Sequence, residues 1–286
     1  MKHRRSKVCG GRGLYFAVLL SGLVFSSHAQ DQNFIAIVPA FMDRQHTDEW
    51  GSPLQLTQQR FILQLYRNAA AVYSEADFIN SSEDTVTAEL SLPSTGFHLG
   101  NHTSWAYQSN GLLGVRLWVA GERIEPELIL NEQVEWYTIH PVFPSGIVTK
   151  IKTLFWVQTS LSDVDSIPGI DTIVILPGVR GLVLDIADAS VWKEAISSVE
   201  ATVIMKEELS PRDTLLVDPD NYETTDSTLI WNLSDVEPDL FDNILIKYNS
   251  TDRQHLPMNT MEILNAYIIR EGYDELLEYV SRLDEE

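Results

Sequence analysis

The chain has 286 residues, with 41 Asp and Glu against 20 Lys and Arg, which gives a formal charge of −21. This excess of negative charge argues against binding to nucleic acids or to anionic membrane surfaces, because both are polyanions. The one cysteine, Cys9, lies close to the N-terminus, so the sequence predicts a fold that depends on buried side chains and uses no disulfide.

Residues 1–29 have the features of an export signal. Five basic residues are followed by an apolar run over residues 14–25 and by a small-x-small cleavage site at Ser27-His28-Ala29. The apolar run is short for a membrane span, which favours cleavage over an uncleaved anchor. We therefore expect a secreted or periplasmic protein of bacterial type, with no transmembrane segment after cleavage. Cleavage would leave 15 basic against 41 acidic residues and a formal charge of −26.

Short strand-like runs begin soon after this signal. Residues 33–38 and the alternating residues 58–67 predict two strands. Residues 71–79 and 85–92 predict a hairpin that Pro93 ends. Residues 94–111 then predict a long connection rich in Gly, Asn, His and aromatic residues.

Residues 112–157 contain three strand-like runs that we expect in one central sheet. In the first run, apolar residues alternate with Arg116 and Trp118, as the two-residue period of a strand requires. Gly121 predicts a tight turn, and Pro126 places the next run at a sheet edge.

The last run of the central stretch, residues 147–157, also alternates. One face carries Ile151, Thr153, Phe155 and Val157, and the other carries Lys150, Lys152, Leu154 and Trp156. Further strands are predicted at residues 172–176, 179–186, 199–205, 228–233 and 243–248.

The character of the sequence changes at Pro257. Asn259 and Glu262 resemble a capping box at the start of a helix, and Gly272 is a natural stop. A second helix is predicted at residues 273–283.

These patterns predict a mainly β protein. The expected fold is an antiparallel β-sandwich, one or two in number, over residues 30–256, with a short helical pair over residues 257–286. If there are two sandwiches, residues 160–166 are the expected boundary.

Two short patterns resemble those of uncharacterised secreted bacterial β-sandwich proteins. The first is Ala76-Asp77-Phe78-Ile79-Asn80, followed by residues 86–93 ending in Leu-Pro. The second is Trp231-Asn232-Leu233, followed by Glu237-Pro238 and Asn243-Ile244. The resemblance implies a sandwich-like fold of unknown function and assigns no catalytic residue.

One candidate ligand site is a flat face of aromatic and basic residues on the central strands. Its members are Arg116, Trp118, Lys150, Lys152 and Trp156. Aromatic faces stack on sugar rings, and cations hold acidic groups, so this face would suit a glycan. The alternative is that both tryptophans are buried beneath the helical tail or a second sheet.

Metal sites are a second possibility. Asp218, Asp220 and Asp226 concentrate the oxygen ligands that calcium prefers, although the segment lacks the EF-hand pattern and also reads as a solvated acidic turn. His98 and His102, with His140 as a third ligand, raise the alternative of zinc, against ordinary loop histidines.

No motif of nucleophilic or metal-assisted catalysis occurs in the sequence. We find no G-x-S-x-G elbow, no H-E-x-x-H helix and no phosphate-binding glycine loop. The sequence therefore favours a non-catalytic exported protein that binds a partner such as a glycan or a cell-envelope protein. The alternatives are a carbohydrate-binding module or carbohydrate-active enzyme using the tryptophan face, and a calcium-stabilised adhesion domain.

Overall fold

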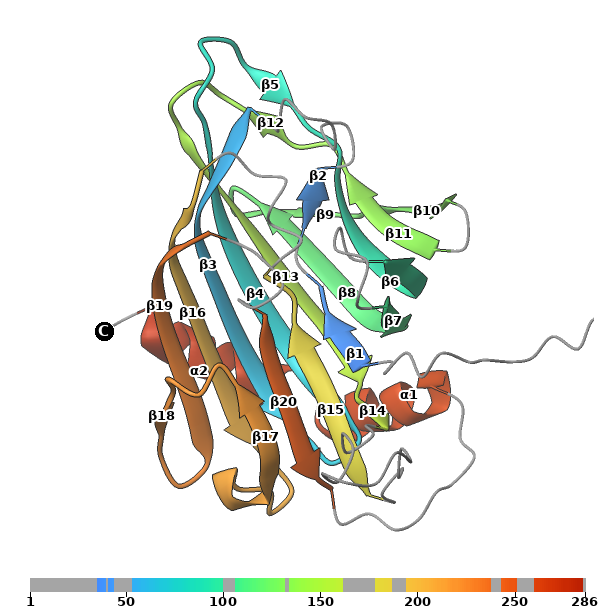
Figure 1. The fold of residues 1–286 in the computed structure, drawn as a ribbon. Helices are drawn as coiled ribbons and strands as arrows, with labels where there is room; N and C mark the ends of the chain where they lie inside the picture. Colours follow the sequence, from blue (N-terminus) through green and yellow to red (C-terminus); the bar gives the residue numbers. More distant parts are fainter. Residues whose placement is uncertain are drawn as a thin grey trace, which may run out of the picture. The chain divides into compact units, whose positions relative to one another are not determined.

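The structure is a computed structural model, and it describes residues 35–39, 41–43, 53–99, 106–131, 134–161, 178–186, 194–237, 243–250 and 260–284 (Figure 1). The predicted export signal, the strand at 172–176 and most of the 160–166 boundary lie outside these residues. No helix in the described ranges is long and apolar enough to cross a membrane.

Eight strands form one sheet, which we call the eight-strand sheet. Their order is β18 (Glu223–Thr224), β19 (Thr228–Val236), β16 (Ile196–Met205), β3 (Leu54–Leu65), β4 (Ala69–Asn80), β13 (Val148–Gln158), β8 (Leu112–Val119) and β9 (Glu122–Ile124). Neighbouring strands are antiparallel except β3 and β16, which run parallel. The predicted turn between β8 and β9 is confirmed: Ala120 and Gly121 both have positive φ, as a tight hairpin turn requires.

Ten strands form the other large sheet, the ten-strand sheet. Its main path is β10 (Glu127–Asn131), β11 (Val134–Ile139), β6 (Leu90–Leu99), β7 (Ala106–Asn110), β1 (Ile35–Val38), β15 (Val179–Leu184), β20 (Ile244–Asn249) and β17 (Thr214–Asp218). Off this path, β2 (Met42–Asp43) pairs with β6 and β14 (Ser160–Leu161) pairs with β15. β1 runs parallel to both of its neighbours.

Three short elements complete the β region and two helices follow it. β5 (Val86–Thr87) pairs with β12 (Val142–Phe143), and a 3₁₀ turn, η2 (Pro211–Asp213), precedes β17. The predicted helical pair is confirmed as α1 (Thr260–Arg270) and α2 (Asp274–Leu283). Gly272 separates them with φ of +64°, a conformation that glycine adopts without strain.

The main cluster of buried side chains draws on both large sheets. It includes Phe61 and Val72 from the eight-strand sheet and Leu182 and Ile246 from the ten-strand sheet. The alternation predicted for β8 and β13 is confirmed, because Leu117, Ile151, Phe155 and Val157 join this cluster whereas Trp118 and Trp156 belong to a second cluster.

The predicted hairpin of residues 71–79 with residues 85–92 is wrong. β4 pairs with β3 and β13, and the chain passes afterwards into the ten-strand sheet. Asn80 directs this exit, because its side-chain amide donates to the carbonyls of Asp84 and Phe143. Pro93, expected to end a strand, lies inside β6 beside a register shift, where a missing N–H donor is tolerated.

The central stretch is also divided between the two sheets. β8 and β13 are neighbours, as expected, but β11 belongs to the ten-strand sheet. Pro126 lies between β9 and β10, the edge strands of different sheets, so it marks the passage from one sheet to the other. Residues 94–111, expected as a loop, are largely strands β6 and β7.

Candidate functional site

The face of the eight-strand sheet that bears Glu75 and Asp77, here called the outer face, has an apolar part beneath the helices. α1 and α2 lie along this sheet (Figure 1). Side chains of β3, β4 and β13 pack there against side chains of the two helices. The cluster contains Ile62, Tyr66, Ala71, Tyr73, Leu154, Trp156, Tyr267, Tyr273, Leu276 and Val280. The amphipathic α2 thus covers an apolar patch that water would otherwise reach.

The structure does not show the predicted tryptophan platform. Trp156 is 0% exposed and stacks on Tyr267, with ring centroids 5.6 Å apart. Trp118 is half-buried against the same cluster, and Arg116 lies over the ring of Tyr273 at 5.0 Å. The helical pair packs against the aromatic side chains on which a sugar was expected to stack.

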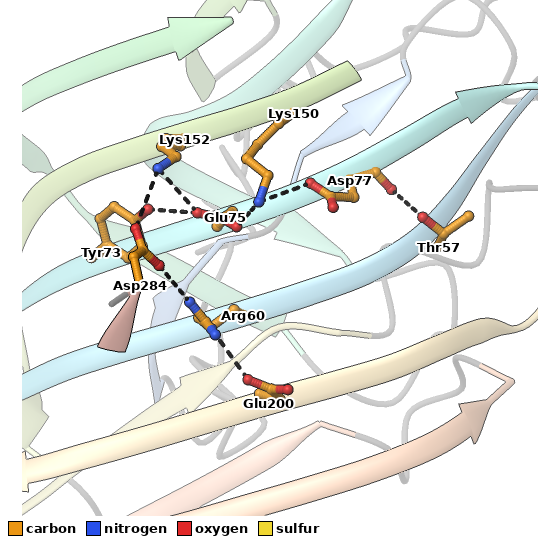
Figure 2. A network of polar contacts seen from close by, with 9 residues as sticks. All are labelled: Thr57, Arg60, Tyr73, Glu75, Asp77, Lys150, Lys152, Glu200 and Asp284. Atoms are coloured by element: carbon orange, nitrogen blue, oxygen red, sulfur yellow. Dashed lines mark hydrogen bonds and ion pairs between the residues drawn. The ribbon is translucent and has the colours of Figure 1, made fainter. Parts of the chain in front are cut away.

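Lys150 and Lys152 lie beyond the helices, in a polar part of the same face. They belong to a group that we call the charged cluster (Figure 2). Its members are Arg60, Glu75, Asp77, Lys150, Lys152, Glu200 and Asp284. The antiparallel pairing of β4 with β13 places Glu75 opposite Lys152 and Asp77 opposite Lys150, so four charges face one another across two strands.

Glu75 is the centre of this cluster. It is 8% exposed, and it accepts hydrogen bonds from Lys150 and from the hydroxyl of Tyr73, the latter at 2.7 Å. Lys152 Nζ lies 3.4 Å from Glu75 Oε2, whereas Lys150 contacts Oε1. Two cations and a hydroxyl therefore compensate the one carboxylate that the sheet buries most deeply here.

Arg60 links the cluster to β16 and to the end of α2. Its Nε donates to Glu200 at 3.2 Å, and its Nη1 donates to Asp284 at 3.3 Å. Asp284 is the C-cap residue of α2, where a negative charge is unfavourable to the helix dipole, so Arg60 and Lys152 offset that repulsion. The helical pair is thereby anchored at the border of the charged cluster.

The pKa values of the two carboxylates on β4 are shifted in opposite directions. Burial would raise the pKa of Glu75, but hydrogen bonds from Lys150 and Tyr73 outweigh it and hold that pKa below its ordinary value. Burial raises the pKa of Asp77, and the negative charge of Glu75 adds to the rise against the opposing charge of Lys150. The site thus stabilises the ionised form of Glu75 and disfavours the ionised form of Asp77.

Asp77 is incompletely satisfied. Its Oδ1 is shielded from solvent and lies 3.6 Å from Lys150 Nζ, which is too long for a hydrogen bond. No hydrogen-bond partner for this oxygen exists in the described part of the chain. In contrast, the backbone carbonyl of Asp77 accepts from Thr57 at 3.0 Å (Figure 2).

A cavity of about 230 Å³ opens at the charged cluster. Four of its lining residues are acidic and two are basic: Glu75, Asp77, Glu200 and Asp284, with Arg60 and Lys150. Gln58 and Ser198 add neutral polar groups, and Leu283 of α2 closes one side. The cavity has room for a small ligand, below the usual volume of a drug-sized pocket.

The predicted calcium ligands lie elsewhere and do not come together. Asp218, Asp220 and Asp226 are each exposed around the end of β17 and the following turn. Within the described ranges, no group of three or more His, Cys, Asp or Glu side chains is placed to hold a metal ion. His102 lies outside those ranges, so the zinc alternative rests on the sequence alone.

The sequence analysis did not single out Glu75, Asp77 or Arg60. A signal was present, because Glu75 and Asp77 share one face of a strand whose other residues are largely apolar. Two acidic side chains on one face of a largely buried strand need positively charged partners, and Lys150 and Lys152 supply them. Only the register of β4 against β13 shows that the two patterns meet.

Comparison with known proteins gives a fold and no family. No family model and no curated protein matches the sequence. Among solved structures, a candidate nutrient-binding protein from Legionella pneumophila is similar, with a TM-score of 0.51 and 12% identity over 76% of this chain and 72% of that one. An M1 zinc metallopeptidase from Deinococcus radiodurans reaches a TM-score of 0.32 and 10% identity, and the match spans 69% of this chain and 43% of that one. The first likeness concerns the fold alone.

Proposed function

We propose that this chain is an exported bacterial protein that binds a small polar ligand in the cavity of the charged cluster and catalyses no reaction. The observation that carries the proposal is Asp77. Asp77 lines the cavity, and its Oδ1 is shielded from solvent, lies 3.6 Å from Lys150 Nζ and has no hydrogen-bond partner in the described residues, whereas Glu75 accepts hydrogen bonds from Lys150 and Tyr73. A shielded polar atom of this kind destabilises the free protein and gains most when a ligand satisfies it.

Export and the lack of catalysis are parts of the proposal that rest on the sequence. The basic and apolar leader, the cysteine-free remainder and the acidic composition support a secreted or periplasmic site of action. The missing catalytic motifs support binding without turnover. The role given to the Legionella protein, candidate nutrient binding, is of the same kind.

We also propose that the two large sheets are layers of a single antiparallel β-sandwich. One buried cluster contains residues of both sheets, which is what two layers with facing apolar sides produce. Tyr248 of the ten-strand sheet supports this arrangement, because its hydroxyl donates to backbone carbonyls at the turn between β3 and β4.

A panel of small ligands tests the proposed function. The protein without residues 1–29 is mixed with amino acids, amines, sugars and dicarboxylates, and thermal unfolding and calorimetry measure binding. Ser198→Trp fills the cavity and is expected to abolish binding, whereas Thr224→Trp, an equal change at an exposed site outside the cavity lining, leaves binding intact. Binding that survives Ser198→Trp, or a panel without any ligand, contradicts the proposal. Turnover on a hydrolase panel contradicts its non-catalytic part.

A further inference from the structure

The charges that line the cavity do not balance. Glu75, Asp77, Glu200 and Asp284 stand against Arg60 and Lys150, an excess of two carboxylates. Lys152 lies beside Glu75 and Asp284 and reduces the excess to one. The cavity lining therefore has a net negative charge, although it includes Arg60 and Lys150.

The cations of the cluster are already engaged. Arg60 bonds to Glu200 and Asp284, and Lys150 bonds to Glu75. Lys152 lies within ion-pair distance of Glu75 and Asp284. An anionic ligand would have to displace one of these carboxylates from its cation, and it would meet the remaining carboxylates at close range.

Among the cavity-lining residues, Gln59 Oε1 and Asp77 Oδ1 are buried without a hydrogen-bond partner in the described part of the chain, and both are acceptors. Asp77 Oδ1 needs a donor, and the raised pKa of Asp77 has the same origin, since burial and the charge of Glu75 oppose its ionisation. Lys150 Nζ forms an ion pair with this oxygen at 3.6 Å, and a second cation at hydrogen-bond distance would relieve both effects further. The donor that the cavity lacks is thus a positively charged one.

The geometry favours an organic cation over a metal ion. The described carboxylates do not converge as a group of three or more, as a hard divalent cation requires. An ammonium or guanidinium group on a short chain would instead donate to Asp77 and extend along Gln58 and Ser198.

We propose that the ligand of this cavity is a small organic cation with a primary ammonium or guanidinium group, which binds through Asp77. The proposal rests on the proposed function, because it names the class of ligand that the same cavity takes. It identifies Asp77 as the residue that recognises the ligand and Glu75 as the residue that accepts the hydrogen bond of the neighbouring Lys150.

Three probes of equal length and different charge test the class of ligand. Putrescine, butane-1,4-diol and succinate present ammonium, hydroxyl and carboxylate groups, and agmatine adds a guanidinium. Calorimetry at pH 7 and low salt is expected to show putrescine or agmatine binding at least tenfold more tightly than the diol, with no binding of succinate. The affinity for the cation falls as salt rises, because the cavity is open to solvent.

Substitutions locate the cation. Asp77→Asn keeps the size of the side chain and is expected to weaken putrescine or agmatine binding at least tenfold. Asp220→Asn makes the same change in net charge at an exposed site outside the cavity and leaves the dissociation constant within twofold. Thermal unfolding confirms that both variants are folded. If Asp77→Asn does not fold, Glu200→Gln at the more exposed rim serves instead, with an expected two- to fivefold loss.

The outcomes separate this inference from the proposed function. Tighter binding of succinate or the diol that is lost in Ser198→Trp overturns the cationic class and leaves a binding protein. Cation binding that is insensitive to both Asp77→Asn and Glu200→Gln overturns the assigned site. Failure of all four probes overturns the inference, and the wider panel then decides the proposed function by itself.

Discussion

Two buried tryptophans provide a test of how the helical pair is held. Trp156 and Trp231 are both 0% exposed. The indole Nε1 of Trp231 donates to the carbonyl of Pro219 at 3.0 Å, whereas Nε1 of Trp156 has no hydrogen-bond partner in the described part of the chain. The two side chains are therefore equally buried, but in the described residues only the indole N–H of Trp231 is hydrogen-bonded.

The expected magnitudes follow from this difference. Burying an aromatic side chain removes about 150–250 Å² from water, which is about 4–6 kcal/mol at roughly 25 cal/mol per Å². Trp156→Ala should therefore lower the free energy of unfolding by about 4 kcal/mol, within the roughly 3–5 kcal/mol range of such truncations. Trp156→Phe loses part of that buried area, which destabilises the fold, but it removes an unsatisfied donor whose burial costs about 1–3 kcal/mol. The free energy of unfolding should therefore fall by about 1 kcal/mol or less.

Trp231→Phe is the matched control. The same change there leaves the carbonyl of Pro219 without its donor, so we expect a loss larger by about 1–3 kcal/mol than for Trp156→Phe. Urea unfolding followed by far-ultraviolet circular dichroism at pH 7 measures all three variants, with equal m-values as the check that the unfolded states are comparable. The reasoning fails if the two Phe variants are destabilised equally, or if Trp156→Phe costs as much as Trp156→Ala.

Three further predictions concern the same face of the sheet. Gly114 has φ of +68°, and a Cβ there would lie 2.6 Å from the hydroxyl of Tyr273, so Gly114→Ala should cost about 2–4 kcal/mol in urea unfolding. Gly121→Ala, with φ of +87° and open space around it, carries the backbone strain without the clash and should cost at least 1 kcal/mol less; equal losses would exclude the clash. The pKa of Glu75 is lowered in the folded protein, so the ionised side chain stabilises the fold at pH values above its unfolded-state pKa of about 4.3. This contribution is lost as pH falls through the folded-state pKa. Glu75→Gln should thus lower the free energy of unfolding at pH 7 by about 1–3 kcal/mol and have a smaller effect at pH 3, and a loss of equal size at both pH values would contradict the assignment. Burial raises the pKa of Tyr267 to about 12, so its neutral form favours the folded state and stability should fall between pH 10 and 12. Absorbance at 295 nm should show delayed tyrosine ionisation in the native protein, and full ionisation near pH 10 without unfolding would refute the burial.

Local patterns in the sequence predicted many of the elements and faces correctly, though not the strands within residues 94–111, and they did not predict strand partners. The alternation around Trp118 and Trp156 identified which side of each strand faces the main core, because that pattern depends only on the two-residue period. Gly272 predicted where α1 and α2 separate. The partners of β4 were not predictable in this way, since its neighbour β3 precedes it and the segment after Asn80 enters the other sheet.

The candidate site shows the same limit. Lys150 and Lys152 were placed together because they are two residues apart on one strand. Their carboxylate partners on β4 are 73 to 77 positions earlier in the sequence, and Asp284 comes from the opposite end of the chain. For Trp156 the sequence left an open platform and burial beneath the helical tail as alternatives, because no local pattern reveals which surface a distant helix covers.

The order of strands in the two sheets has a consequence for how the molecule can assemble. β1, near the start of the described chain, has β15 as a neighbour, and β3 lies beside β16. A polypeptide that emerges N-terminus first can complete neither layer of strands until residues beyond about position 205 are available. Long-range pairing of this kind slows folding and leaves early strands with unpaired edges. The edge of β3 that pairs with β16 and the edge of β1 that pairs with β15 therefore stay open in a nascent chain until the later strands have been made.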